Sequence, residues 1–130
     1  MALMLFRERN KAKWVGIRPA HDGTQVYAAS SAVNTTTTLY TVPAGKTLFL
    51  TFAQLTREGT GTGFTSLAIY DGVGALVATI LISNAIANAT MSEAASFEMD
   101  PWEVPEGYTV GVRSSAANTT ARACIKGRIE

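Results

Sequence analysis

Two copies of a Val-Pro-x-Gly motif constrain the fold of this chain more than any other feature. The first is Val42–Gly45 and the second is Val104–Gly107, and residues that favour a strand follow each of them. In such a turn, proline presets φ at the second position and glycine closes the fourth. Because proline has no N–H group, it belongs at a strand boundary. The two motifs therefore predict two corners of one β architecture.

Alternation of apolar and polar residues predicts about eight strands. It is clearest in Lys46–Leu55, where Leu48, Leu50 and Phe52 are expected to share one face. Leu76–Ile82 is apolar on both faces, as expected of a central strand. The other predicted strands are Gln25–Ala29, Thr38–Val42, Phe64–Tyr70, Met91–Met99, Tyr108–Arg113 and Ala121–Ile129. In Phe64–Tyr70, Leu67 and Ile69 are expected to share one face. An all-β fold follows, an antiparallel β-sandwich or small jelly roll.

The segments between these strands carry turn and loop signals. Asp71–Gly74 predicts a hairpin turn. The segment Arg57–Gly63 contains three glycines and predicts a flexible, exposed loop, and Ser30–Thr37 is expected to be a loop or an edge. Residues 83–90 are also expected to be a loop, and residues 100–103 lead into the second corner.

Residues 1–20 do not resemble part of the sandwich. Met1–Phe6 is apolar, Arg7–Lys13 is charged, and Trp14–Ile17 is a short apolar run. We expect an extended N-terminal arm over residues 1–20 and a β-sandwich domain over residues 21–130. Whether the arm holds a short strand or a helix over residues 3–13 stays open.

The chain carries few charges, and they are unevenly distributed. Charged residues make up 16% of the sequence, against about 25% in a typical soluble domain. Two explanations stay open: a Thr-rich surface, or a surface covered by neighbouring subunits. The net charge is +4 over residues 1–18, −6 over residues 71–106 and +3 over residues 107–130. These segments can pair within one chain or between subunits, where complementary charge fixes register.

No catalytic, cofactor or metal site is expected. His21 and Cys124 are the only residues of their kinds, so a His/Cys metal cluster is excluded. Asp100, Glu103 and Glu106 are the alternative, a weak oxygen-rich calcium site. The run Gly45-Lys46-Thr47 resembles the end of a phosphate-binding loop, but that motif needs a glycine where Tyr40 stands and a helix afterwards.

Two groups of residues are candidates for partner binding. In the last predicted strand, Ala121, Ala123, Ile125 and Ile129 alternate with Arg122, Cys124, Lys126 and Arg128, which gives one apolar and one basic face. The basic face lacks interleaved aromatic residues, so a subunit contact is favoured over nucleic acid. The candidates are Met4, Phe6, Arg7, Arg9, Lys11, Lys13, Trp14, Arg122, Lys126 and Arg128.

The sequence also bears on compartment. The charges at the N-terminus follow the apolar residues instead of preceding them, which is not the pattern of a secretory signal. No run approaches the roughly 18 apolar residues of a membrane span. A single cysteine excludes an intrachain disulfide and suits assembly in the cytosol.

The segment Thr38–Leu50 resembles a strand–corner–strand element of small virion proteins of tailed bacteriophages, and Val104–Val110 resembles its partner element. The resemblance covers residues 38–129. It implies a β-sandwich or jelly roll, often trimeric, with terminal arms that reach neighbours. The leading expectation is therefore a non-enzymatic capsid decoration (cement) subunit. It would form a homo-oligomer, with a trimer expected, bind the major capsid protein, and reside in the virion after assembly in the host cytoplasm.

Two alternatives to a decoration subunit stay open. One is a tail or fibre module, and the other is a receptor-binding or carbohydrate-binding sandwich. Sugar sites combine exposed aromatic side chains with polar groups, and Trp14, Trp102 and Tyr70 are the candidates here. An enzyme is the least favoured class, because no catalytic constellation is found. The symmetry and the identity of the partner are not determined by the sequence.

Overall fold

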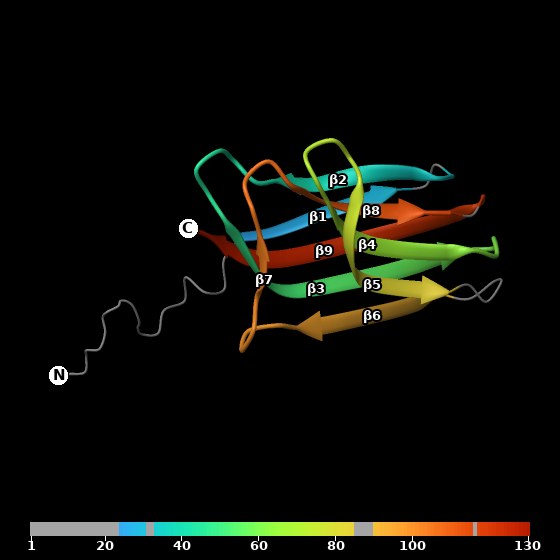
Figure 1. The fold of residues 1–130 in the computed structure, drawn as a ribbon. Coiled ribbons are helices and arrows are strands. Elements are labelled where there is room, and N and C mark those ends of the chain that lie inside the picture. Colours follow the sequence, from blue (N-terminus) through green and yellow to red (C-terminus); the bar gives the residue numbers. More distant parts are fainter. Residues whose placement is uncertain (1–23, 31–32, 85–89, 116) are drawn as a thin grey trace.

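The described part of the chain is built from β-strands and the turns between them (Figure 1). The computed structural model describes residues 24–30, 33–84, 90–115 and 117–130. Within these ranges there is no helix, so the expectation of an all-β fold is confirmed. The strands are β1 (Thr24–Ser30), β2 (Thr35–Thr41), β3 (Leu48–Gly59), β4 (Phe64–Tyr70), β5 (Leu76–Asn84), β6 (Met91–Ser96), β7 (Trp102–Val104), β8 (Thr109–Ser114) and β9 (Thr119–Ile129).

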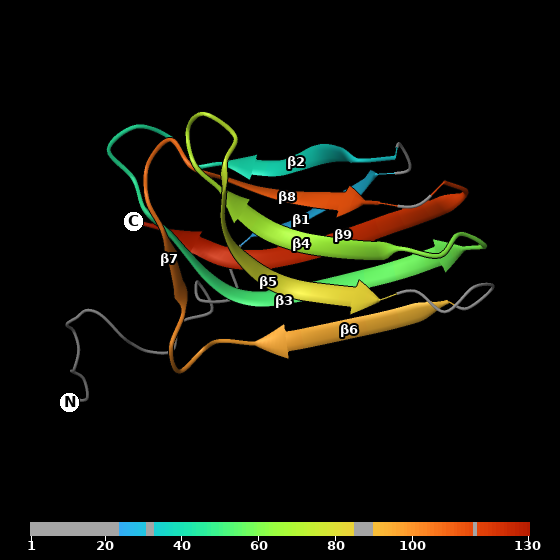
Figure 2. The same ribbon diagram turned by 45° about the vertical axis from the view of Figure 1, so that its right-hand side comes forward.

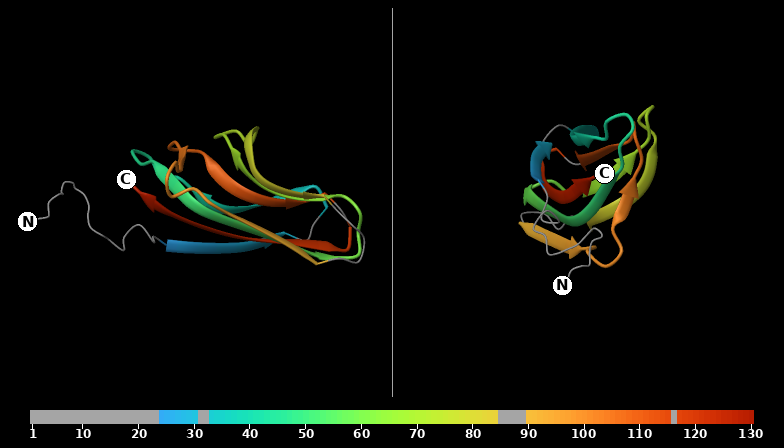
Figure 3. Two further views of the ribbon diagram at one scale, coloured as in Figure 1. Left: turned by 90° about the horizontal axis from the view of Figure 1, so that it is seen from below. Right: turned by 90° about the vertical axis from the view of Figure 1, so that its left-hand side faces the viewer.

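These strands form two antiparallel sheets. The five-stranded sheet has the order β1-β9-β3-β6, and β7 also pairs with β3. The four-stranded sheet has the order β2-β8-β4-β5. The pairs β4–β5, β3–β6, β2–β8 and β1–β9 are nested along the chain, and the pairs β3–β9 and β4–β8 join them into sheets. Figures 2 and 3 show the two sheets from further sides.

One hydrophobic core receives side chains from both sheets. The predicted shared face of Leu67 and Ile69 and that of Ala121, Ala123 and Ile125 both point into this core and are confirmed. Ile129, which the same pattern placed with them, is exposed. The buried cluster consists of Val42, Leu48, Leu50, Ala53, Leu55, Leu67, Ile69, Val104, Val110, Val112, Ala121, Ala123 and Ile125.

A β-bulge in β3 corrects the predicted face of Phe52. Leu50 lies opposite Gly127 and Phe52 lies opposite Lys126, so Thr51 is an extra residue in the ladder. A bulge shifts the alternation of side chains by one position. Leu50 therefore points inward before the bulge, Phe52 points outward after it, and Ala53 is the next residue in the core. Thr51 is buried, and its hydroxyl donates to the carbonyl of Lys126.

The two Val-Pro-x-Gly motifs form neighbouring corners, as predicted, but the frame of each turn differs by one residue. Lys46 N donates to Pro43 O, and the corresponding bond joins Tyr108 N to Pro105 O. Proline is therefore the first residue of each turn, and glycine is the third, where φ is +75° at Gly45 and +80° at Gly107. A positive φ at the third position is the mark of a type II turn, and it favours glycine.

Backbone hydrogen bonds hold the two corners side by side. Val42 N donates to Tyr108 O, and Gly107 N donates to Val42 O, both at 2.9 Å. The Glu106 carboxylate accepts a further bond from Gly45 N. Val42 and Val104, the first residues of the two motifs, are both fully buried in the core. The corners thus lie together at one end of the fold, and each is a corner of one β architecture, as predicted.

Several predicted boundaries are wrong. β2 begins at Thr35 and not at Thr38, inside the segment expected to be a loop or an edge, because a run of β-branched threonines finds a ladder partner in β8; β2 does lie at an edge of its sheet. β7 is a strand that was not predicted; it follows Pro101 directly and pairs with Leu48–Leu50. β6 ends at Ser96 and not at Met99. The described residues therefore contain nine strands where about eight were expected.

The predicted exposed loop over Arg57–Gly63 is the largest error. β3 continues to Gly59, and Arg57 is completely buried. Its guanidinium donates to the carbonyl of Gly61, and Gly61 N donates to the hydroxyl of Thr119 at 3.0 Å. A backbone bond from Thr60 N to Asn118 O adds to this contact. The connection from β3 to β4 is thus packed against the start of β9.

Candidate interaction surfaces

The β4–β5 hairpin carries the most exposed apolar strand of the described residues. Its turn is the one predicted at residues 71–74: the Asp71 carboxylate accepts bonds from Val73 N at 3.0 Å and Ala75 N at 2.9 Å. Asp71 N also donates to Ala75 O. An aspartate that bonds to its own turn in this way stabilises the loop locally. The turn therefore fixes where β5 begins.

β5 lies at an edge of the four-stranded sheet, which corrects the prediction of a central strand. Within the described residues it pairs only with β4. Leu76, Val77 and Ile82 are 60%, 53% and 47% exposed, and Val73 in the turn is 90% exposed. Other side chains of the strand, Ile80 and Leu81, pack against the core. Some apolar side chains of β5 thus pack against the core, and others lie exposed at the surface.

The edge of β5 lacks charge and proline, two of the features that usually protect an edge, although two register shifts against β4 mark β-bulges in the strand. An edge strand presents unpaired N–H and C=O groups, and natural proteins commonly blunt such edges with charges, proline or very short strands. β5 is nine residues long, and its sequence Leu76–Asn84 contains neither a charged residue nor proline. An exposed apolar edge of this kind suits contact with another chain.

The basic face predicted for the last strand is present, but its charge is partly compensated. Arg122, Lys126 and Arg128 lie on the outer face of β9, away from the core. Arg122 Nε is 3.1 Å from the Glu58 carboxylate. Arg128 Nε is 2.5 Å from the Glu130 carboxylate, and its guanidinium lies 4.8 Å from the centre of the Phe49 ring. In the described part of the chain, Lys126 forms no ion pair.

The remaining predicted partner-binding residues cannot be placed on this surface. They lie in the arm, outside the described residues, together with His21. The residues are Met4, Phe6, Arg7, Arg9, Lys11, Lys13 and Trp14.

Cys124 is buried although it lies on the outer side of β9. It is paired in register with Tyr27 of β1, whose side chain is exposed. A hydrogen bond with the Cys124 side chain raises the pKa of the Tyr27 phenol, and the negative charge of the thiolate and some desolvation raise it further. The neighbouring residues Arg122 and Lys126 on the same face make Cys124 part of a polar strip and not of the core.

This contact predicts a change in the titration of Tyr27. Cys124→Ala removes both the hydrogen-bond partner and the thiolate, so the pKa of Tyr27 is expected to fall toward the ordinary value of 10.0. Ultraviolet absorbance of the ionised phenol, followed against pH, measures the shift, and Tyr27→Phe identifies which part of the curve belongs to Tyr27. A titration curve that Cys124→Ala leaves unchanged would contradict the assignment.

The alternative sites raised by the sequence are only partly supported. In residues 24–30, 33–84, 90–115 and 117–130, no group of three or more His, Cys, Asp or Glu side chains is placed to hold a metal ion. Asp100, Glu103 and Glu106 are therefore not brought together. Of the aromatic candidates for sugar binding, Tyr70 is buried, Trp102 is half-buried, and Trp14 lies outside the described ranges.

Comparison with known proteins adds no relative to this description. Neither a protein-family model nor a curated protein sequence matches the chain. Among the residues that the structure describes, there is no helix with the length and apolar character needed to cross a membrane.

Proposed function

We propose that this chain is a non-enzymatic structural subunit of a virion, most simply a capsid decoration (cement) protein. It associates with copies of itself, as a trimer, and binds the major capsid protein after assembly in the host cytoplasm. The observation that carries the proposal is the exposed, uncharged edge strand β5. In a monomer, such an edge promotes unspecific association, whereas in an assembly a neighbouring chain covers it.

The order of the strands supports the finer fold class, a β-sandwich of the jelly-roll type. Nested antiparallel pairs describe one long hairpin, with β4 and β5 at its tip and β1 and β9 at its open end. Rolling this hairpin up adds the pairs β3–β9 and β4–β8 and divides the strands between two sheets. If β6 and β7, which both pair with β3, count as one interrupted strand, eight strand positions result. Jelly rolls of eight strands occur among viral capsid proteins and lectins.

The low charge of the surface agrees with this proposal. Edge strand β2 consists mainly of threonine, and β5 is apolar, so both edges of the four-stranded sheet are uncharged. A surface with few charges gives little protection against association. Of the two edges, β5 exposes larger apolar side chains and is the better contact for a neighbouring subunit.

Lysines on β5 test the proposal. Val77→Lys together with Ile82→Lys places two like charges on each copy of the edge, so self-association is expected to be lost. Multi-angle light scattering at micromolar protein concentrations measures the mass of the particle, and co-sedimentation with capsids of the same virus measures lattice binding. Both are expected to fall below detection in the double variant.

The matched control places the same charges on the other edge of the same sheet. Thr36→Lys with Thr38→Lys changes two exposed residues of β2 and is expected to leave the particle mass unchanged. A wild-type chain that is monomeric in scattering and does not bind capsids would overturn the proposal. Equal loss of association in the two double variants would overturn the role of β5.

A tail or fibre module that binds a receptor glycan is the second candidate. Trp102 and Phe97 line an open hollow beside β7, with their ring centres 6.0 Å apart. Aromatic side chains beside polar groups are typical of ligand sites. A glycan array with no ligand for the wild-type chain would exclude this candidate.

A further inference from the structure

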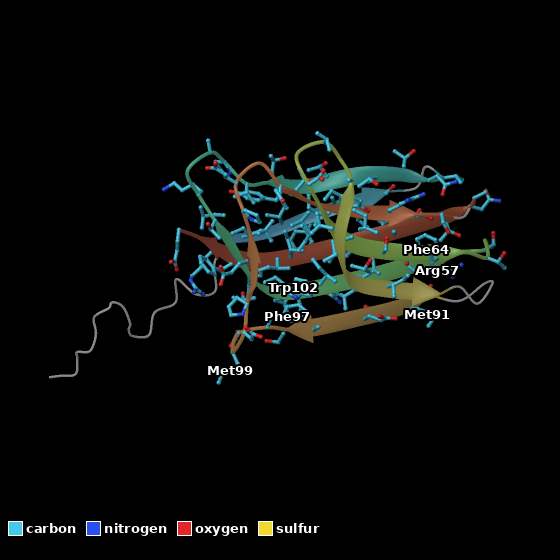
Figure 4. The ribbon with its side chains drawn as sticks, viewed as in Figure 1. Arg57, Phe64, Met91, Phe97, Met99 and Trp102 are labelled. Carbon is cyan, nitrogen blue, oxygen red and sulfur yellow. The ribbon has the colours of Figure 1, made fainter. Side chains whose placement is uncertain are left out.

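An apolar hollow lies in the connection between β6 and β7, at the opposite side of the five-stranded sheet from β1. Residues 96–103 line this hollow, which is open to solvent and has a volume of about 750 Å³. The Phe97 and Trp102 rings meet edge to face at 89°. Met99 is 99% exposed at the rim, and Figure 4 shows it pointing away from the body of the molecule. A fully exposed methionine at the rim of a hollow lined by two aromatic rings is an unusual surface for a protein that stays in water.

Backbone contacts shape the hollow without help from another molecule. Phe97 N donates to Thr51 O at 2.7 Å, which ties the hollow to the bulge in β3. Asp100 N donates to Phe97 O and closes the turn that carries Met99. Trp102 begins β7 and lies opposite Leu50 in the ladder. The hollow is therefore pre-formed, and this reduces the entropic cost of filling it.

The rim of the hollow is acidic. Glu98, Asp100 and Glu103 are exposed, and the lining contains no basic residue. In the described part of the chain, none of these three carboxylates forms an ion pair. An occupant of this hollow must then combine apolar side chains with positive charge.

The N-terminal segment of this chain has that combination. Met1–Phe6 contains two methionines, two leucines and a phenylalanine, and Arg7–Lys13 adds four basic residues and one acidic residue. Resting on the proposed function as an assembly subunit, we propose that the hollow receives residues 1–13 of a second copy of the chain. The apolar end enters between Phe97, Met99 and Trp102, and the basic residues that follow face the acidic rim.

The position of β1 favours a second copy over the same chain. The segment joins the fold at Thr24, and the strand order places β9 and β3 between β1 and β7. Thr24 lies opposite Gly127, which lies opposite Leu50, so the direct path across the outer face of the sheet to the hollow of the same chain passes Lys126 and Arg128. Like charges disfavour that path. A segment that arrives from a neighbouring copy meets the acidic rim first.

Disulfide cross-linking of full-length chains tests this inference. Phe6→Cys is introduced in one preparation and Met99→Cys in a second that carries a size tag, so the mixed dimer migrates separately from either homodimer. The native Cys124 is buried and remains in both. As a matched control, Thr62→Cys replaces Met99→Cys, because Thr62 is exposed in the connection between β3 and β4, away from the β5 edge. We expect about fivefold or more mixed dimer with Met99→Cys than with Thr62→Cys, and less at high salt, which screens the rim charges.

Charge exchange provides the second arm of the test. Glu98→Lys with Asp100→Lys is expected to reduce the mixed dimer about fivefold, and Arg7→Glu with Arg9→Glu in the partner is expected to restore it. Equal cross-linking at positions 62 and 99, or no restoration by the charge exchange, would overturn the inference. So would a chain carrying both Phe6→Cys and Met99→Cys that gives only an intrachain link at a concentration where scattering shows the oligomer. Scattering is measured in parallel: an oligomer that fails to cross-link contradicts this inference alone, whereas a monomer contradicts the proposed function.

Discussion

Gly59→Ala is expected to destabilise the fold by at least about 2 kcal/mol, since backbone strain and overpacking each cost about 1–3 kcal/mol. At Gly59 φ is +131°, a conformation that residues with a side chain rarely adopt. A Cβ at this position would lie 2.7 Å from Thr119 Cα and closer still to the carbonyl oxygen of Asn118. Both atoms belong to the backbone of the 117–120 turn and of β9, so no flexible side chain can move aside. Chemical denaturation followed by circular dichroism measures the loss.

Gly45→Ala is the matched control for this prediction. Gly45 also has a positive φ, +75°, but a Cβ there would meet nothing within 4 Å. Its cost is therefore conformational alone, about 1–2 kcal/mol. A loss at Gly59 no greater than the loss at Gly45 would show that the close contact with Asn118 and Thr119 does not constrain the fold.

Arg57→Ala is expected to destabilise the fold by about 2–5 kcal/mol, the range for removing a large buried side chain. Arg57 is completely buried near the end of β3. Its guanidinium donates to the carbonyl of Gly61 and so holds the connection to β4. Alanine leaves a cavity and removes this bond, and the lost bond adds to the cost. The free energy of unfolding in denaturant is the quantity to compare.

Two variants separate the causes of this loss. Arg57→Met retains most of the volume but not the hydrogen bond, so it is expected to be more stable than Arg57→Ala. Arg122→Ala removes an arginine whose ion pair with Glu58 is exposed to solvent, and such pairs contribute about 0–1 kcal/mol. If Arg57→Ala were as mild as Arg122→Ala, the buried arginine would not stabilise this end of the fold.

Local signals predicted the corners and the hairpin correctly. Pro43, Pro105 and the glycines after them mark turns because their backbone preferences act within a few residues. Asp71 does the same, since its carboxylate bonds to Val73 and Ala75. The position of proline within each corner turn was predicted one residue too late. Hydrogen bonds between the two corners, from Val42 N to Tyr108 O and from Gly107 N to Val42 O, help to set this position, and they join residues far apart in the sequence.

The candidate surfaces were much harder to predict. The apolar sequence Leu76–Ile82 predicted a central strand. This pattern cannot distinguish a central strand from an edge strand, because it does not show whether a second strand or solvent lies beside it. Only the pairing of β4 with β8 on its other side leaves β5 at the edge. The hollow beside β7 was missed for a related reason: Phe97 and Trp102 are five residues apart, and the turn at residues 97–100 brings their rings together.

By itself, the sequence determined that the described chain is all-β and where its corners fall. It also determined that Leu67 and Ile69 share the inward face of one strand, and that Ala121, Ala123 and Ile125 share the inward face of another. These features depend on turn chemistry and on the two-residue period of a strand. Only the tertiary structure decided the phase of β3 after Thr51, the burial of Arg57 and the exposure of β5. Each of these depends on contacts between residues far apart in the chain, and no local pattern records which strand becomes the neighbour.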